Sequence, residues 1–172
     1  MIGDRVGPVA ETADYIKTAY HQVEERTGVR FGKAFLEGVL EEGTAIFDSY
    51  PAALAMRAFK LSRPRQSIAF AGRIQRAIYH DGMLPRPLEG YAKLATEFGL
   101  DETHFLEHMN DATTDMAAQA EFELAQRLGI TGFPTLLLEY GEDEKLGVLS
   151  RGYIPYDQLE KTFLRAKEVI GH

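Results

Sequence analysis

Apolar residues recur every three or four positions through most of the chain, and this spacing predicts a succession of amphipathic helices. The first expected helix covers residues 11–26 and ends at Gly28, a residue type that often closes helices. Asp48 or Ser49 can cap a second helix, which is expected to end near residue 61. Further helices are expected over 64–81, 88–98 and 101–109, and from a cap at Thr113 or Thr114 to residue 128, with a less regular apolar stretch at 31–40.

The pattern changes near the C-terminus. Residues 134–140 are mostly apolar, an acidic turn follows, and a second short run covers 145–150, which predicts a β-hairpin. Pro155 then opens a last amphipathic helix. Three successive leucines, Leu136–Leu138, suit a strand that is buried on both faces in the middle of a sheet. Because only two strands are evident, either another strand pairs with this one or an apolar edge stays open.

Composition and charge exclude several classes of function. The 172 residues contain 19 Lys and Arg against 26 Asp and Glu, so the formal charge is −7. An acidic chain is a poor nucleic-acid binder, since phosphates are contacted by clustered basic residues. The chain has no apolar run of about 18 residues or more, so we expect no membrane contact. Residues Met1–Ala10 lack the apolar core of a signal peptide, which favours a cytoplasmic location.

Four short segments carry a resemblance to a known family. Gly129–Thr135, with the sequence Gly-Ile-Thr-Gly-Phe-Pro-Thr, resembles the loop before the third strand of the thioredoxin-like fold. Leu149–Pro155 and the last helix are similar to the closing β-α unit of the DsbA family. Val23–Gly28 and Arg73–Tyr79 resemble stretches in the helical insertion of cytoplasmic DsbA-like proteins. The resemblance covers nearly the whole chain, and its most specific element is the Thr-Gly-Phe-Pro-Thr loop.

The resemblance implies an α+β fold and a binding loop. It predicts a helical subdomain over 1–128, the DsbA-like insertion, followed over 129–172 by the terminal β-β-α of an incomplete thioredoxin-like domain. In the family the proline of the loop is cis, and the backbone of the preceding residue pairs with an extended substrate. The implied substrate- or partner-binding residues are therefore Thr131, Gly132, Phe133 and Pro134. Phe133 can alternatively be a core aromatic at the entry to a strand.

The chain also departs from the family in its chemistry. Family members begin with a strand and a Cys-x-x-Cys motif at a helix N-terminus, which lowers the pKa of the attacking thiol. This chain contains no cysteine, so it has no thiol nucleophile, disulfide or thiolate metal ligand, and we assign it no catalytic residue and no cofactor. In the family's sheet the missing strand lies beside the one expected at 134–140.

Two further patterns have alternative interpretations. His104–His108 matches His-x-x-Glu-His, a zinc-peptidase signature that needs a third ligand such as Asp111. A solvated helix face is the favoured interpretation, and we predict no metal.

Four arginines also have two interpretations. They can form a cradle for an acidic peptide or glutathione, or they can pair with the many carboxylates: Arg63, Arg65, Arg73 and Arg76.

Three hypotheses of function remain open. The chain can be part of a DsbA-like oxidoreductase or disulfide isomerase whose Cys-x-x-Cys unit lies upstream, with these 172 residues inactive by themselves. It can be a non-catalytic module that binds an extended peptide, or a second copy of itself as a homodimer, at the open strand edge. It can also resemble the glutathione-binding isomerase and kappa-type transferase relatives of DsbA, a hypothesis that predicts retention on immobilised glutathione.

Overall fold

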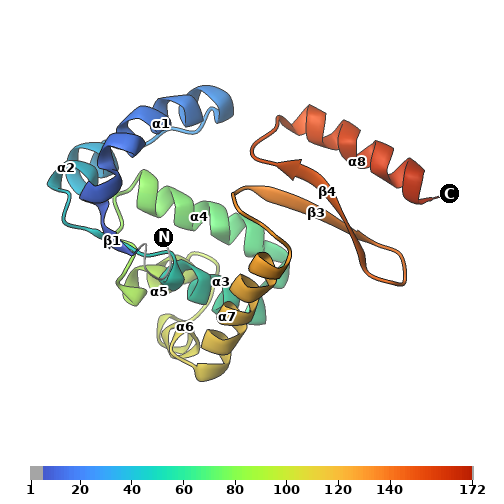
Figure 1. Cartoon of the computed structure of the whole chain (residues 1–172). Coiled ribbons are helices and arrows are strands. Elements are labelled where there is room, and N and C mark those ends of the chain that lie inside the picture. The colour runs from blue at the N-terminus through green and yellow to red at the C-terminus, as the bar shows by residue number, and fades with distance from the viewer. Residues whose placement is uncertain (1–5, 172) are drawn as a thin grey trace. The chain divides into compact units, whose positions relative to one another are not determined.

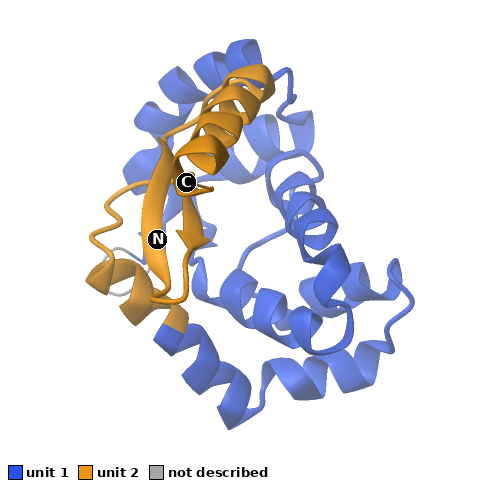
Figure 2. Cartoon of the chain, turned by 90° about the vertical axis from the view of Figure 1, so that its right-hand side faces the viewer, with its two compact units in different colours: residues 1–120 blue, residues 121–172 orange. Residues whose placement is uncertain are grey.

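The computed structural model describes residues 6–171, so half of the Met1–Ala10 segment discussed above lies outside the described residues (Figure 1). The chain divides into two compact units, residues 1–120 and 121–172, and the division falls within helix α7, Ala112–Arg127 (Figure 2). The described part combines many helices with a terminal β-β-α segment, which confirms the predicted α+β class. No helix in this part has the length and apolarity needed to cross a bilayer.

Helices dominate the first unit. A short 3-10 turn, η2 (Val9–Thr12), precedes the helix α1. The remaining helical elements are α1 (Ala13–Thr27), the π-helical η3 (Ala34–Val39), α2 (Leu40–Glu42), α3 (Tyr50–Ser62), the 3-10 turn η4 (Pro64–Gln66), α4 (Ser67–Tyr79), α5 (Leu88–Thr96), α6 (Glu102–Met109) and most of α7.

The ends of these helices follow the signals in the sequence. Gly28 closes α1 in the left-handed conformation, and its N–H donates to the carbonyl of Glu24. Asp101 caps α6, because its side chain accepts a hydrogen bond from the N–H of His104 at 2.9 Å. The predicted cap of α7 was wrong by a few residues. Asp111 fills this role by accepting from the N–H of Thr113 at 2.7 Å.

The first unit also contains a small sheet that the sequence pattern did not predict. Strand β1 (Gly7–Pro8) pairs antiparallel with β2 (Ile46–Phe47). Each strand has only two residues, so neither shows the alternation by which strands are recognised. The pairing fixes the entry to α1 against the entry to α3.

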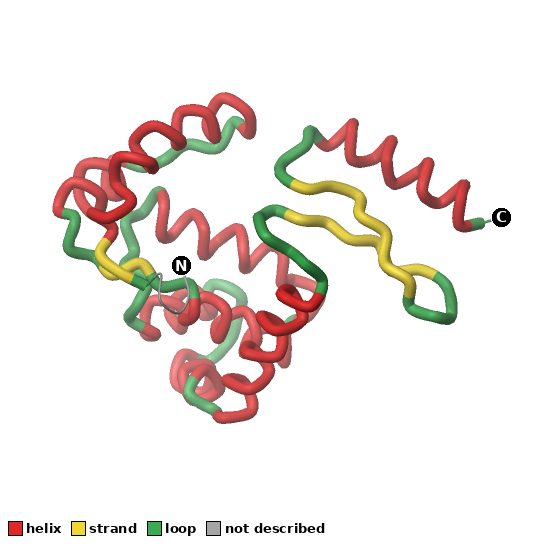
Figure 3. The backbone as a smooth tube through the Cα atoms, viewed as in Figure 1, coloured by secondary structure: helices red, strands yellow, loops and turns green. Residues whose placement is uncertain are grey.

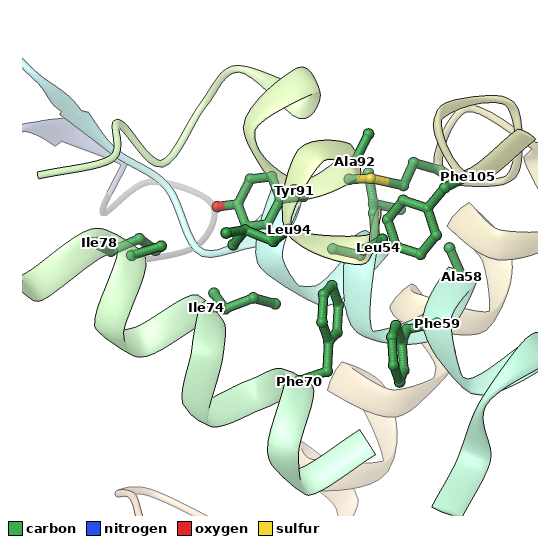
Figure 4. Close-up of a cluster of buried hydrophobic side chains, with 14 of the residues drawn as sticks. Leu54, Ala58, Phe59, Phe70, Ile74, Ile78, Tyr91, Ala92, Leu94 and Phe105 are labelled. Atoms are coloured by element: carbon green, nitrogen blue, oxygen red, sulfur yellow. The ribbon is translucent and has the colours of Figure 1, made fainter. Parts of the chain in front are cut away.

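An aromatic core holds α3, α4, α5 and α6 together (Figure 4). The rings of Phe59 and Phe70 stack in parallel planes with centroids 4.0 Å apart. Phe98 meets both rings edge-on, and Phe105 meets Phe70 in the same way. Burial raises the pKa of the Tyr91 hydroxyl, which donates to the carbonyl of Pro85 at 2.7 Å.

The second unit contains the predicted hairpin and last helix (Figure 3). Strand β3 (Thr135–Tyr140) pairs antiparallel with β4 (Lys145–Arg151), and α8 (Tyr156–Ile170) follows. Of the two alternatives given above for Leu136–Leu138, the structure shows the open apolar edge within the described residues and not burial on both faces. Leu136 is 41% exposed and the other two leucines are half-buried, because the described sheet has two strands and one covering helix.

Candidate functional site

The predicted binding residues form one exposed turn between α7 and β3. Thr131, Gly132, Phe133 and Pro134 are all exposed, and the Phe133 side chain has an exposed fraction of 82%. Phe133 is therefore no core aromatic within the described residues, and this alternative is wrong. The Phe133–Pro134 peptide bond is cis, as the resemblance implied.

Hydrogen bonds hold the turn at both ends. The hydroxyl of Thr135 donates to the carbonyl of Gly132 at 2.8 Å, which closes the turn on itself. The N–H of Gly152 donates to the carbonyl of Pro134 at 2.8 Å and ties the turn to the end of β4. The Phe133 ring is thus presented from an anchored backbone.

Strand β3 has a free edge. Within residues 6–171 it pairs with β4 alone. Backbone groups of successive strand residues point to opposite sides. Because the Pro134 carbonyl points toward β4, the N–H and C=O groups of Thr135, Leu137 and Glu139 point away from it. The edge therefore offers a row of donors and acceptors that begins next to Phe133.

The two faces of the hairpin differ. On one face, Leu136 and Leu149 form a hollow of about 350 Å³ with residues of α8 that include Leu159 and Phe163. The other face contains Leu137 and its cross-strand partner Val148, which is 50% exposed. Its apolar surface therefore adjoins the free edge, and a pairing partner at this edge would meet both apolar side chains and backbone groups.

Within residues 6–171 the zinc signature gains no third ligand. His104 and His108 line a small hollow of about 160 Å³ together with Asp101, but the Asp101 carboxylate caps α6. Among the described residues no three His, Asp or Glu side chains are arranged to hold a metal ion. Asp111, the third ligand considered above, caps α7, and the hydrogen bonds from Thr113 lower the pKa of its carboxyl.

Two of the four arginines, Arg73 and Arg76, pair with carboxylates instead of forming a cradle, and Arg76 Nε lies 4.0 Å from Oδ1 of Asp81. Arg73 donates from Nε and Nη2 to the Glu97 carboxylate at 2.7 and 2.9 Å and from Nη1 to Asp81 at 3.0 Å. These hydrogen bonds lower the pKa of Glu97 and raise the pKa of Arg73. The pKa of Asp81 is lowered, first by its hydrogen bond with His80. Arg63 and Arg65 line an open hollow beside Phe98.

Sequence reasoning missed an aromatic groove in the first unit. It has a volume of about 540 Å³ and lies among α1, the start of α3 and α4. Its aromatic residues are far apart in the sequence and follow no motif: Tyr15, Tyr20, Phe31, Phe47 and Tyr79. Only the helical spacing of Tyr15 and Ile16 with Tyr20 and Val23 indicated an apolar face on α1.

Comparisons with known proteins identify the family. A family model described as thioredoxin matches residues 21–161. A proposed protein disulfide isomerase from Nitrosomonas europaea superimposes with a TM-score of 0.86 at 26% identity, covering 98% of this chain and 79% of that one. The cytosolic disulfide reductase DsbM from Pseudomonas aeruginosa gives 0.78 at 30% identity, covering 95% of this chain and 79% of that one. The chain therefore belongs to the thioredoxin family, as a DsbA-like protein.

DsbM has also been solved with glutathione, and that structure superimposes with a TM-score of 0.75. No curated protein matches the sequence. The relatives confirm the resemblance to DsbA-like oxidoreductases and the helical insertion, while the chain itself contains no cysteine.

Proposed function

We propose that these 172 residues are a non-catalytic, peptide-binding member of the DsbA-like family. An extended polypeptide pairs with the free edge of β3, and the exposed Phe133 side chain contacts it. Strand addition of this kind takes its affinity from backbone hydrogen bonds and its selectivity from side-chain contacts. The observation that carries the proposal is the junction of an anchored, exposed aromatic turn with an unpaired strand edge.

The role fits protein disulfide handling without thiol chemistry in this chain. Its relatives are described as a disulfide reductase and a proposed disulfide isomerase, and both descriptions name disulfides. With no cysteine, these residues can bind a polypeptide but cannot exchange its disulfides. The cytosolic description of DsbM supports the cytoplasm as the place of action.

The test is a titration with a short, fluorescein-labelled, cysteine-free peptide of alternating valine and serine, followed by polarisation. Phe133→Ala is expected to raise Kd about tenfold, or about 1.4 kcal/mol. Tyr156→Ala removes another exposed aromatic of the same unit and should leave Kd unchanged. A Kd that is the same in wild type and Phe133→Ala would contradict the proposed role of the turn.

A second variant tests the edge itself. Leu137→Pro removes a backbone N–H that points away from β4, and prolines are tolerated on edge strands in this orientation. The variant should lose peptide binding while amide hydrogen exchange of β4 stays near wild type, which shows that the hairpin still forms. Undiminished binding would show that the peptide does not pair with β3.

A second copy of the chain is the second candidate partner, because β3 is complementary to itself. In an antiparallel pair centred on Leu137, the two Leu137 side chains meet across the two-fold axis. Thr135 then lies opposite Glu139 of the other copy, and Leu136 lies opposite its Leu138. Centring the pair on Leu138 would instead place Leu137 opposite Glu139, which sets an apolar side chain against a charge.

A further inference from the structure

The aromatic groove of the first unit is a separate place where a ligand can bind. Its walls come from α1, from Phe31, from the junction of β2 with α3 and from α4, and its volume is about 540 Å³. Pockets for small molecules usually measure about 300–1,000 Å³ and are mostly apolar with a few polar groups. This groove has that size and composition, and all its lining residues belong to residues 1–120.

Aromatic rings form much of the wall. The Phe31 ring lies 5.6 Å from that of Tyr20 and 5.8 Å from that of Tyr79, measured between centroids. Tyr15 lies at the rim and is 74% exposed, so its ring is available to a ligand. Aromatic faces carry partial negative charge and attract cations as well as apolar groups.

The described residues that line the groove carry charge of one sign only. Among the described residues that line it, Asp48 is the one charged side chain, and no Lys, Arg or His joins it. Asp48 Oδ1 accepts from the N–H of Tyr50 at 2.9 Å. Oδ2 lies 3.8 Å from Nε of Arg86, well beyond the usual 2.7–2.9 Å of a charge-assisted hydrogen bond. One carboxylate oxygen therefore keeps the capacity to accept a strong hydrogen bond from a ligand.

We propose that this groove binds small amphiphilic cations, with the apolar body against the aromatic wall and an ammonium or guanidinium group at Asp48. An anionic amphiphile of the same shape would meet the Asp48 carboxylate, and no basic residue is among the described residues that line the groove, Arg86 lying beside Asp48 but outside the lining. The site uses no residue of β3, and its occupant is a small molecule rather than a polypeptide.

The test compares n-octylammonium, n-octanol and n-octanoate, which share one alkyl chain and differ in charge. Binding is followed by NMR of isoleucine methyl groups, with Ile16, Ile74 and Ile78 as groove reporters and the 90% exposed Ile68 as an off-site reporter. Octylammonium should shift the groove methyls and bind at least tenfold more tightly than octanoate. Equal affinities, or an equal shift at Ile68, would overturn the proposal.

Two variants locate the charge effect, and a third tests the groove itself. Asp48→Asn keeps an oxygen that can cap the N–H of Tyr50 but removes the charge, so the advantage of octylammonium over octanol should disappear. Glu42→Gln removes an exposed carboxylate outside the lining and should leave the advantage intact. Ala19→Phe fills part of the groove and should weaken all three ligands. An advantage that survives Asp48→Asn would show that the carboxylate does not select the cation.

Discussion

The N–H of Gly152 and the carbonyl of Pro134 are joined by a 2.8 Å hydrogen bond, although the two residues stand on either side of the whole hairpin. This contact closes the base of the hairpin where β3 begins and β4 ends. It also turns the carbonyl of Pro134 toward β4, so the backbone of the next residue, Thr135, faces the free edge.

Gly152 is needed for this contact because its φ is +83°, a backbone conformation that side chains disfavour. Gly152→Ala should destabilise the base of the hairpin by about 1–2 kcal/mol. Amide hydrogen exchange of β3 and β4 should then become at least about fivefold faster. Gly132→Ala is the matched control, since the Cβ it adds would meet no atom within 4 Å and its φ is not positive. An equal effect of the two substitutions would contradict this assignment.

The second prediction concerns the stability of the first unit and compares two residues of the same helix. Phe70 is fully buried and stacks on Phe59, whereas Ile68 is 90% exposed. Phe70→Ala should lower the free energy of unfolding by about 3–5 kcal/mol, the usual cost of removing a buried ring. Ile68→Ala should change it by less than about 0.5 kcal/mol. Urea denaturation measures both, and a similar loss in both variants would contradict the burial of Phe70.

The pairing of Arg73 with Glu97 predicts a pH dependence. The pKa of the Glu97 carboxyl is lowered in the folded chain by hydrogen bonds from Arg73. The pair therefore stabilises the fold above the usual carboxyl pKa, and this contribution is lost as the pH falls through the lowered value. Arg73→Gln should cost up to about 1 kcal/mol near neutral pH, as is typical of an exposed pair, and nothing in strong acid.

Urea denaturation across the acidic range, with NMR titration of the Glu97 carboxyl, checks this dependence. Arg65→Gln removes an exposed arginine from the same unit and should leave the Glu97 pKa unchanged. If the Glu97 pKa is the same in wild type and Arg73→Gln, the hydrogen bonds of Arg73 do not set it.

The sequence predicted those features that depend on local patterns. Helical spacing located α1 and α4, and the acidic turn after Tyr140 separated β3 from β4. The two-residue pairing of Gly7–Pro8 with Ile46–Phe47 could not be predicted, because it joins distant segments too short to show a period.

The two candidate sites likewise differ in whether the sequence could reveal them. The turn at Thr131–Pro134 is contiguous, so a resemblance over a few residues could find it. The groove brings Tyr15 and Phe31 together with Asp48 and Tyr79, and only the tertiary packing makes these residues neighbours. The sequence left two alternatives open for Leu136–Leu138 for a related reason, since three successive leucines do not reveal how many strands stand beside them.

The last prediction concerns the oligomeric state and follows from the self-pairing of β3. If two copies pair around Leu137, sedimentation velocity should show a dimer, and Leu137→Lys should dissociate it by placing two ammonium groups opposite each other. Val148→Lys is the matched control, because Val148 lies beside Leu137 on the same face but in β4, away from the free edge of β3. A dimer lost in both variants would be held by the apolar face instead of the edge. A wild-type monomer whose stability Leu137→Lys does not change would exclude self-pairing and leave the edge to a peptide partner.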